Sequence, residues 1–272
     1  MRLGWWRTSH LRSILREARI ETPKLALDVG VGAGHWTVTL FSAFPEAGTK
    51  IIGLDVEDYW IETSRTFVAA HLPRHQFKAE LGDACDIGGN SDIYDLVTCQ
   101  TVLMHLKAPE NALREMCRVL RPGGVLLISE PMNQLNMALS SCLMAAGDVN
   151  VGRTIWSFWQ KYHVVLNRLG HGNHNIAARM PGLLKSIDGL EDVRAYHSDV
   201  VSFKGPDQWD FANLLTYLKS NPESREVLAT FQDGELSDLE GALEELEVLL
   251  TARGEIVANP QQNILFVARK SQ

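Results

Sequence analysis

The sequence predicts an α/β fold built on a mostly parallel sheet with crossover helices. Between Leu25 and Glu130, short apolar runs alternate with longer segments of helical period, which is the pattern expected of such a sheet. Acidic residues stand at or just after the ends of several of these runs. A chain of 272 residues, 45% of them hydrophobic, is long enough to bury one sizeable core and to carry inserted segments.

Five apolar runs are predicted to be strands of this core, which is expected at 22–131. They are Leu25–Val29, Ile51–Asp55, Phe77–Leu81, Asp95–Cys99 and Val125–Ser129. Crossover connections between parallel strands all turn the same way, so the carboxyl ends of the strands line one edge of the sheet. The acids near those ends are therefore expected to converge on one crevice: Asp28, Asp55, Asp83 and Glu130.

Two segments outside this core are predicted to cover the crevice. Residues 1–21 are expected to form an N-terminal helical lid. Residues 132–185 interrupt the alternation and are expected to form a helical cap insertion over the active site. Four apolar side chains of the cap fall on one face of a helix: Ile155, Trp159, Tyr162 and Leu166.

The remaining chain, 186–272, is expected to complete the core sheet. Strand character returns at Val193–Phe203 and at Asn263–Arg269. The acidic stretch between them is predicted to be a helical insertion at 206–258. Ser237 and Glu240 form a capping-box pattern, which predicts that a helix starts there.

Composition narrows the class of partner. The formal net charge of −7 and the pI near 5.7 provide no general field that attracts a phosphate backbone, so a small-molecule partner is favoured over nucleic acid. Four cysteines without C-x-x-C pairing, and an N-terminus without a long apolar run, predict a cytoplasmic location. No stretch approaches the roughly 18 consecutive apolar residues of a membrane span. Monomer and homodimer both stay open.

A glycine-rich loop is the first candidate binding element. The segment LDVGVGAGHW, residues 27–36, places Gly30, Gly32 and Gly34 between a predicted strand and a predicted helix. Glycines permit a tight turn and close approach of a ligand, while the helix start offers free amide donors to a carboxylate or phosphate. An ordinary strand-to-helix turn is the structural alternative.

Later strand ends add elements that suit an adenosine ligand. Asp55 lies about 20 residues beyond the glycines, where a carboxylate can accept hydrogen bonds from both ribose hydroxyls. Asp83 and Ala84 follow the third strand, where an acceptor can meet an adenine amino group. The segments YDLV (94–97), CQTVLMH (99–105) and RVLRPGG (118–124) complete an ordered set.

This ordered set resembles the class I S-adenosylmethionine (SAM) dependent methyltransferases, especially the small-molecule branch. The resemblance implies a Rossmann-like sheet of seven mostly parallel strands with the last strand antiparallel, SAM as cofactor and S-adenosylhomocysteine (SAH) as product. It assigns the methionine part of SAM to Asp28, Gly30, Gly32 and Gly34. It assigns the ribose to Asp55, the adenine to Asp83 and Ala84, and the sulfonium side to Gln100. After the ribose acid the chain departs from the family's pattern of a bulky apolar residue followed by small polar ones, so either Val56 or Tyr59 is expected to form the adenine wall.

Two other functions compete with this interpretation. An NAD(P)-dependent Rossmann oxidoreductase shares the glycine loop, but its fingerprint G-x-G-x-x-G differs from the G-x-G-x-G found here. A SAM-binding protein without catalytic activity would carry the same motifs, because cofactor motifs indicate binding and not turnover. Release of SAH separates the second alternative from an enzyme.

The methyl acceptor is predicted to be a small molecule, with O, N or C as the nucleophile. In-line transfer from a sulfonium needs alignment above all, and a base only where the acceptor must lose a proton. Candidate catalytic residues are His105, Glu130, His171 and His174, and candidate substrate-binding residues are Trp159, Tyr162 and Asn175. No metal is predicted, since histidines and acids do not fall at paired ligand spacings.

Overall fold

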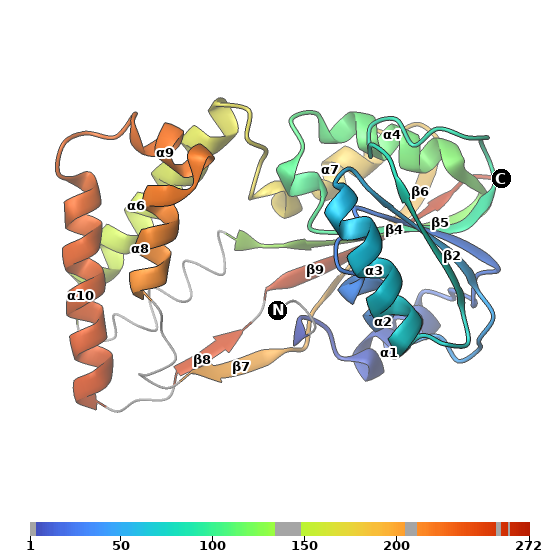
Figure 1. The fold of residues 1–272 in the computed structure, drawn as a ribbon, viewed down its shortest axis with the longest axis horizontal. Coiled ribbons are helices and arrows are strands. Elements are labelled where there is room, and N and C mark those ends of the chain that lie inside the picture. Colours follow the sequence, from blue (N-terminus) through green and yellow to red (C-terminus); the bar gives the residue numbers. More distant parts are fainter. Residues whose placement is uncertain (1–3, 134–147, 205–210, 254–256, 261) are drawn as a thin grey trace. The chain divides into compact units, whose positions relative to one another are not determined.

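The computed structural model describes residues 4–133, 148–204, 211–253, 257–260 and 262–272. The chain divides into two compact units, which are described separately (Figure 1). The first unit comprises Met1–Pro131, Ile176–Val200 and Asn263–Gln272, and the second comprises Met132–Asn175 and Val201–Gln262.

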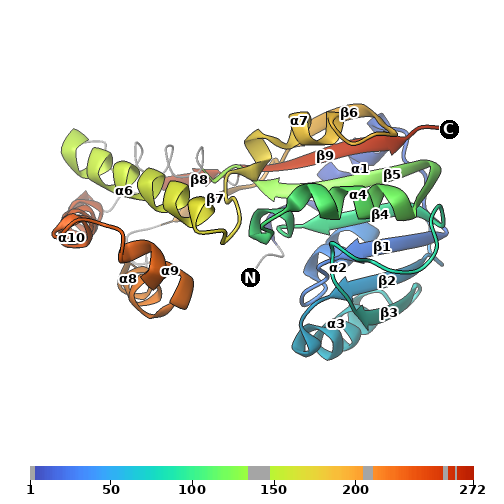
Figure 2. The same cartoon turned by 90° about the horizontal axis from the view of Figure 1, so that it is seen from above.

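A seven-stranded sheet organises the first unit. Its order is β3-β2-β1-β4-β5-β9-β6, which can be followed in Figure 2. The pairs within β3-β2-β1-β4-β5 are parallel, whereas β9 runs antiparallel to both β5 and β6. The bounds are β1 Leu25–Val29, β2 Lys50–Asp55, β3 Gln76–Leu81, β4 Tyr94–Gln100, β5 Leu120–Pro131, β6 Leu190–His197 and β9 Asn263–Lys270.

This sheet confirms the predicted fold class. The predicted first strand has the observed bounds, and the next four are extended in the structure by one or more residues. The antiparallel last strand agrees with the Rossmann-like arrangement that the resemblance implied. Because the parallel strands point the same way, the ends of β1, β2, β3 and β4 share one edge of the sheet.

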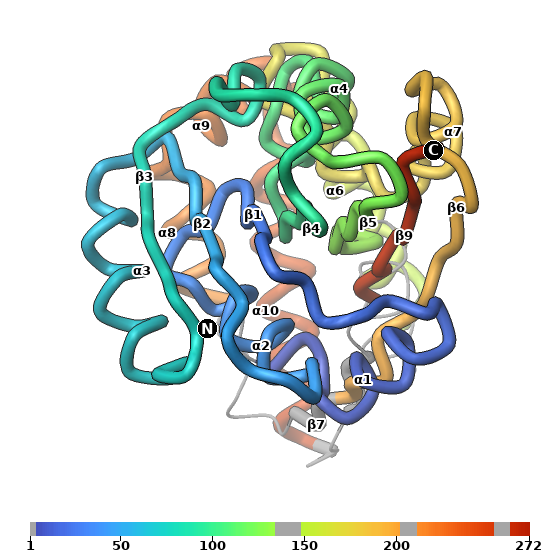
Figure 3. The backbone as a smooth tube through the Cα atoms, turned by 90° about the vertical axis from the view of Figure 1, so that its right-hand side faces the viewer, coloured from blue at the N-terminus to red at the C-terminus, as the bar shows by residue number. Residues whose placement is uncertain are grey.

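Helices cover both faces of the sheet in the first unit (Figure 3). One face carries α1 (Thr8–Glu17), α2 (His35–Phe41) and α3 (Asp58–His71), and the other carries α4 (Pro109–Val119) and α7 (Met180–Lys185). The short helices η2 (Leu103–His105) and η3 (Ile176–Ala178) belong to the same unit. In the described ranges, no helix has the length and apolar composition that a membrane crossing requires.

The N-terminal segment contributes to the core of the first unit. Trp6, Leu11 and Ile14 are buried in one cluster with Trp36 and Leu40 of α2. The Trp6 indole also donates a 3.0 Å hydrogen bond to Ser129 Oγ at the end of β5. The segment that was predicted to be a lid is therefore packed against the sheet, and a covering role for it stays a prediction.

The second unit has its own apolar core. Its helices are α6 (Val149–Arg168), α8 (Phe211–Ser220), α9 (Pro222–Leu228) and α10 (Glu235–Arg253), and β7 (Val201–Lys204) pairs antiparallel with β8 (Val257–Pro260). Asp148 caps α6 by accepting hydrogen bonds from the amides of Asn150 and Val151. Leucines of α10 and aromatic residues of α6 share the buried cluster that holds these helices together.

Two local predictions in the C-terminal half were wrong. The end of the predicted helical insertion, 206–258, includes Val257 of strand β8. The last long helix starts at Glu235, so Ser237 lies inside it and does not cap it. The cap predicted at 132–185 includes Ile176–Lys185, which the structure groups with the first unit. Its part at 134–147 lies outside the described residues.

Candidate functional site

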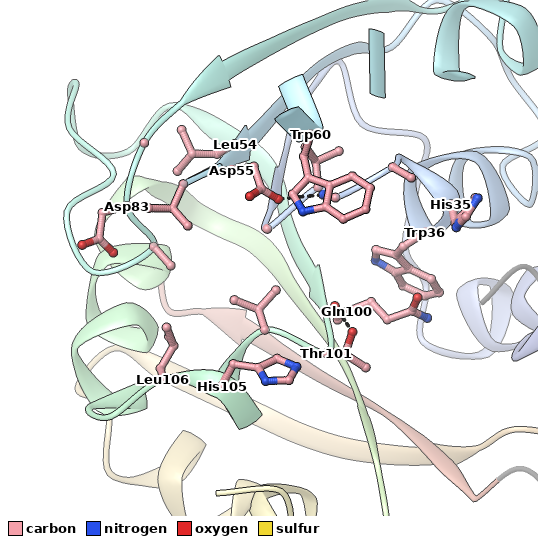
Figure 4. Close-up of a pocket in the computed structure, with 18 residues that line it drawn as sticks. His35, Trp36, Leu54, Asp55, Trp60, Asp83, Gln100, Thr101, His105 and Leu106 are labelled. Atoms are coloured by element: carbon pink, nitrogen blue, oxygen red, sulfur yellow. Dashed lines mark hydrogen bonds between the residues drawn. The ribbon is translucent and has the colours of Figure 1, made fainter. Parts of the chain in front are cut away.

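A cavity of about 640 Å³ opens at the shared carboxyl edge of the sheet (Figure 4). Its walls come from the loops that follow β1, β2, β3 and β4. Seven of the nine predicted cofactor residues line it: Gly30, Gly32, Asp55, Val56, Asp83, Ala84 and Gln100. The other two, Asp28 and Gly34, are not among the lining residues.

The three loop glycines have different surroundings. All adopt positive φ values, 67° for Gly30, 51° for Gly32 and 84° for Gly34, which L side chains rarely tolerate. A Cβ on Gly30 would lie 2.3 Å from Val102 Cγ2, and one on Gly34 would lie 2.5 Å from Val68 Cγ2. A Cβ on Gly32 would meet nothing within 4 Å. Gly30 and Gly34 therefore allow close packing, whereas Gly32 leaves open space on the cavity side.

Asp55 is held rigidly at the end of β2. The amide of Gly32 donates a 2.8 Å hydrogen bond to its Oδ2, and the amide of Glu57 donates a 3.1 Å bond to its Oδ1. Asp55 is only 7% exposed, and it lines the cavity. Because a carboxylate oxygen can accept more than one hydrogen bond, both oxygens keep capacity for ligand hydroxyls.

Asp83 lies on the loop that follows β3. Its Oδ1 accepts a 2.8 Å hydrogen bond from the Cys85 amide, which fixes the turn. The residue is exposed, and Gly82 and Ala84 line the cavity beside it. Of the two residues considered as an adenine wall, Val56 lines the cavity and Tyr59 does not.

The loop after β4 is strained where it meets the cavity. Thr101 has a φ of 54°, a left-handed conformation that is unfavourable for a β-branched residue. Its amide donates a 2.9 Å hydrogen bond to the Ser129 carbonyl, and its hydroxyl donates to the Gln100 carbonyl. This geometry directs the chain into η2, on which the exposed His105 reaches the cavity.

Glu130 supports this loop from beneath. It is fully buried at the end of β5, and its Oε1 accepts hydrogen bonds of 3.1 Å from Val102 N and 2.9 Å from Leu103 N. Its side chain does not line the cavity. The structure therefore favours a role for Glu130 in holding the loop that carries His105, rather than contact with a substrate.

Asp28 acts at the base of the glycine loop. It is 1% exposed, and its Oδ2 accepts a hydrogen bond from the Thr37 hydroxyl of α2. No described residue donates a hydrogen bond to its Oδ1. Burial, together with repulsion from Asp55, raises the pKa of Asp28 to about 7, against the opposing effect of the Thr37 hydrogen bond.

The other predicted site residues belong to the second unit. His171 Nε2 lies 2.7 Å from Glu226 Oε2, and the ring of His174 lies 5.5 Å from that of His163. Tyr162 is 5% exposed, and its hydroxyl lies 2.7 Å from Ser224 Oγ. Trp159 packs on the same core, and the amide of Asn175 donates to Asn173 Oδ1. Their roles toward a substrate stay predictions.

Several cavity residues were not predicted from the sequence. Trp60, in the first turn of α3, lines the cavity together with Asp55, and Trp36 forms part of the wall with His35 (Figure 4). The Trp36 indole is fixed by a 2.8 Å hydrogen bond to Thr98 Oγ1. Their positions just after a loop glycine and just after the acid of β2 were signals that could have identified them.

Metal binding has no obvious site in the described part of the chain. No group of three or more histidine, cysteine, aspartate or glutamate side chains is arranged there to hold a metal ion. The described cysteines, Cys85, Cys99 and Cys117, are free. Burial raises the pKa of Cys99 well above its ordinary value, with further contributions from Glu130 and Asp28.

Comparison with known families identifies a match over more than half of the chain. Residues 23–168 match the family described as "Methyltransferase domain". The matched region contains the glycine loop and the strand-end acids that line the cavity.

Two curated relatives are similar over part of their length. Trans-aconitate 2-methyltransferase of Methylobacterium radiotolerans is 34% identical over 127 residues, which are 47% of this chain and 45% of that protein. Demethylmenaquinone methyltransferase of Shouchella clausii is 31% identical over 119 residues, 44% of this chain and 50% of that protein. The chain thus matches about half the length of these relatives.

A solved structure extends the likeness in fold. Phosphoethanolamine N-methyltransferase 2 of Haemonchus contortus, in complex with phosphomonomethylethanolamine and SAH, superposes with a TM-score of 0.51. The match covers 99% of this chain and 54% of that chain at 18% sequence identity, and it is evidence of a common fold.

Proposed function

The chain belongs to the class I SAM-dependent methyltransferases, and from this premise we propose that it binds SAM in the carboxyl-edge cavity and methylates a small molecule. The alternative of an NAD(P)-dependent Rossmann oxidoreductase has no support in this family membership. The proposal rests chiefly on Asp55, whose two oxygens are each held by one backbone amide while the side chain faces the cavity.

The ribose of SAM fits this arrangement. Two neighbouring hydroxyls require two acceptors at a fixed separation, and a carboxylate that is already oriented loses little entropy when it binds them. Charge-assisted hydrogen bonds of this kind are each worth about 1.5–3 kcal/mol. We assign the ribose to Asp55, with the Trp60 side chain as a neighbour that shields these bonds from water.

The two ends of the cofactor follow from the lining on either side of Asp55. Asp83, Ala84 and Val56 offer an acceptor and an apolar surface to adenine. The open space at Gly32, next to the start of α2, suits the methionine carboxylate. We place the sulfonium toward Gln100, whose side chain is largely buried at the end of β4.

When bound, SAM supplies an electrophilic methyl group on a positively charged sulfur. The chain's own contribution is alignment of the acceptor and exclusion of water, because positive charge is dispersed as the methyl group moves. His105 is the exposed imidazole at the cavity, so we assign to it the removal of a proton where the acceptor carries one. Glu130 keeps the backbone under His105 in place.

Cofactor binding is tested by calorimetric titration with SAH. Asp55→Asn keeps the shape of the side chain but removes its charge and replaces one acceptor with a donor, so SAH affinity should fall about 10- to 100-fold. Asp58→Asn is the matched control, since Asp58 is exposed three residues later and does not line the cavity. Unchanged affinity in a folded Asp55→Asn variant would refute the ribose assignment.

Turnover is tested by screening acceptors for SAH release. The panel begins with the chemistry named in the relatives and includes trans-aconitate, a demethylmenaquinone analogue and phosphoethanolamine, followed by wider sets of acids, phenols and amines. Release of SAH that depends on the acceptor, and is lost in Asp55→Asn, supports the enzyme. Tight SAH binding without turnover on any compound would instead favour the non-catalytic SAM-binding protein.

A further inference from the structure

A second cavity, of about 610 Å³, lies at the opposite edge of the sheet in the first unit. It is bounded by the connection from α1 to β1, the first residues of β4 and the turn that opens β5. The proposed reaction does not use this cavity. Its titratable lining residues are Arg19, Glu21, Lys24, Asp95, Arg121 and Arg269.

The lining is cationic in an acidic protein. Four cationic and two anionic side chains give the cavity a formal charge of +2, whereas the whole chain carries −7. Both oxygens of Asp95 already have protein donors: its Oδ2 accepts hydrogen bonds from the amides of Lys24 and Leu25, and its Oδ1 accepts one from Arg121 Nε. Asp192 lies outside the lining and pairs with Arg269 Nε at 3.9 Å, which lowers the formal charge but leaves it positive, so the local field favours an anion.

Two guanidinium groups are fixed before any ligand arrives. Arg269 Nη2 donates hydrogen bonds of 2.7 Å and 2.9 Å to the carbonyls of Ala18 and Arg19 at the end of α1. Arg121 is held by its 2.6 Å bond to Asp95 and a 3.1 Å bond to the Pro122 carbonyl. A guanidinium has five N–H donors, so each arginine keeps donors beyond those contacts. Fixed planar donors are suited to an oxyanion.

Three further polar groups at this cavity have no partner among the described residues. The side chains of Arg19 and Lys24 form no ion pair or hydrogen bond with any described residue. The hydroxyl oxygen of Thr22 is buried and also lacks a partner. Arg19 has a φ of 53°, at a helix end where glycine is usual, so a cation is present there despite backbone strain.

We propose that this cavity binds a small multivalent oxyanion of the phosphate or polycarboxylate type. Arg121 and Arg269 provide the fixed planar donors, Arg19 and Lys24 add charge at the rim, and the Thr22 hydroxyl supplies a neutral donor. The ligand joins the end of α1 to the amino ends of β1 and β4. Since β1 has five residues, about 15 Å of strand separates this site from the cofactor cavity.

The test is calorimetric titration with inorganic phosphate, and separately with citrate, in chloride buffer containing saturating SAH. The wild-type chain should bind at least one of the two saturably, and the tighter of the two identifies the ligand type. Arg19→Gly combined with Lys24→Ala should weaken that binding about tenfold. Because Arg19→Gly also relieves a left-handed backbone, the variant should unfold no more easily than wild type.

Two single variants complete the test. Arg16→Ala removes an exposed arginine in the last turn of α1. Because Arg16 does not line the cavity, anion affinity should be retained. Thr22→Val replaces the buried hydroxyl with a methyl group and should lower anion affinity without loss of stability. Absence of saturable binding to both anions, full affinity in the double variant, or equal weakening by Arg16→Ala would each overturn the proposal.

Discussion

Gly30 and Val102 are in such close contact that a Cβ on Gly30 would lie 2.3 Å from Val102 Cγ2. This contact joins the glycine loop to the loop that carries His105. Gly30→Ala should therefore lower the free energy of unfolding more than Gly32→Ala, since both introduce strain at positive φ but only the first creates a clash. We expect a difference of about 1–3 kcal/mol by urea unfolding.

The control for this prediction is a second substitution at Val102. Val102→Ala removes both γ carbons, so it should restore part of the stability of Gly30→Ala while it destabilises the wild-type background. If Gly30→Ala and Gly32→Ala are equally stable, the contact with Val102 does not limit the packing of the two loops.

Gly32→Val should have the opposite profile in a binding experiment. A Cβ there meets open space on the cavity side, so the branched side chain would occupy volume that we assign to the cofactor. Calorimetry should detect no SAH binding in a variant that still unfolds cooperatively. Normal SAH affinity in Gly32→Val would show that the methionine part of the cofactor lies elsewhere.

The sequence was informative where structure depends on local pattern. Short apolar runs, the glycine loop and the strand-end acids were enough to predict the core of the sheet and the loops that form the cavity, although fewer than half of the individual lining residues were named. The start of α10 was misplaced because the capping-box pattern pointed to Ser237, whereas one long-range and one local contact stabilise the chain at Glu235. Glu235 pairs with Lys161 of α6 and accepts a hydrogen bond from the Gln232 amide, so the helix begins before the Ser237 signal.

Side-chain roles were harder to predict than positions. The sequence placed Glu130 at the correct strand end, but only the structure shows that it binds two backbone amides of the loop that follows β4. His171 and Glu226 are 55 residues apart, and no pattern in one sequence pairs them. Trp60 was overlooked because an aromatic residue in a helix is usually core, and it becomes recognisable only beside Asp55.

Glu130→Gln should lower turnover through the loop that follows β4. The neutral amide oxygen binds the Val102 and Leu103 amides less strongly than a carboxylate, so the position of His105 should become less well defined. We expect a drop of about tenfold in kcat with SAH affinity unchanged. The pH dependence of kcat should keep its shape, because a positioning residue does not exchange the proton; loss of one limb would identify Glu130 as the base.

His105→Gln should reduce kcat about 100-fold or more for an acceptor that must lose a proton, while SAH affinity stays within error. The comparison variant is His171→Gln, because His171 is already paired with Glu226 in the second unit. We expect that variant to change stability more than turnover. A large kcat effect in His171→Gln and none in His105→Gln would move the base to the second unit.

Asp28 should make the stability of the fold depend on pH. Its pKa is about 7 in the folded chain and near 3.8 when the carboxyl is unperturbed, so the folded state binds the proton more tightly. The free energy of unfolding should fall as pH rises from about 4 to about 7, by up to about 4 kcal/mol from this group, and then level off.

Asp28→Asn removes this contribution, while its amide oxygen can still accept the Thr37 hydrogen bond. Urea unfolding at pH 5 and pH 8 should therefore show the variant gaining stability relative to wild type at the higher pH, whereas Asp58→Asn should show no such change. A stability difference between Asp28→Asn and wild type that is the same at both pH values would mean that the buried carboxyl is ionised throughout this range.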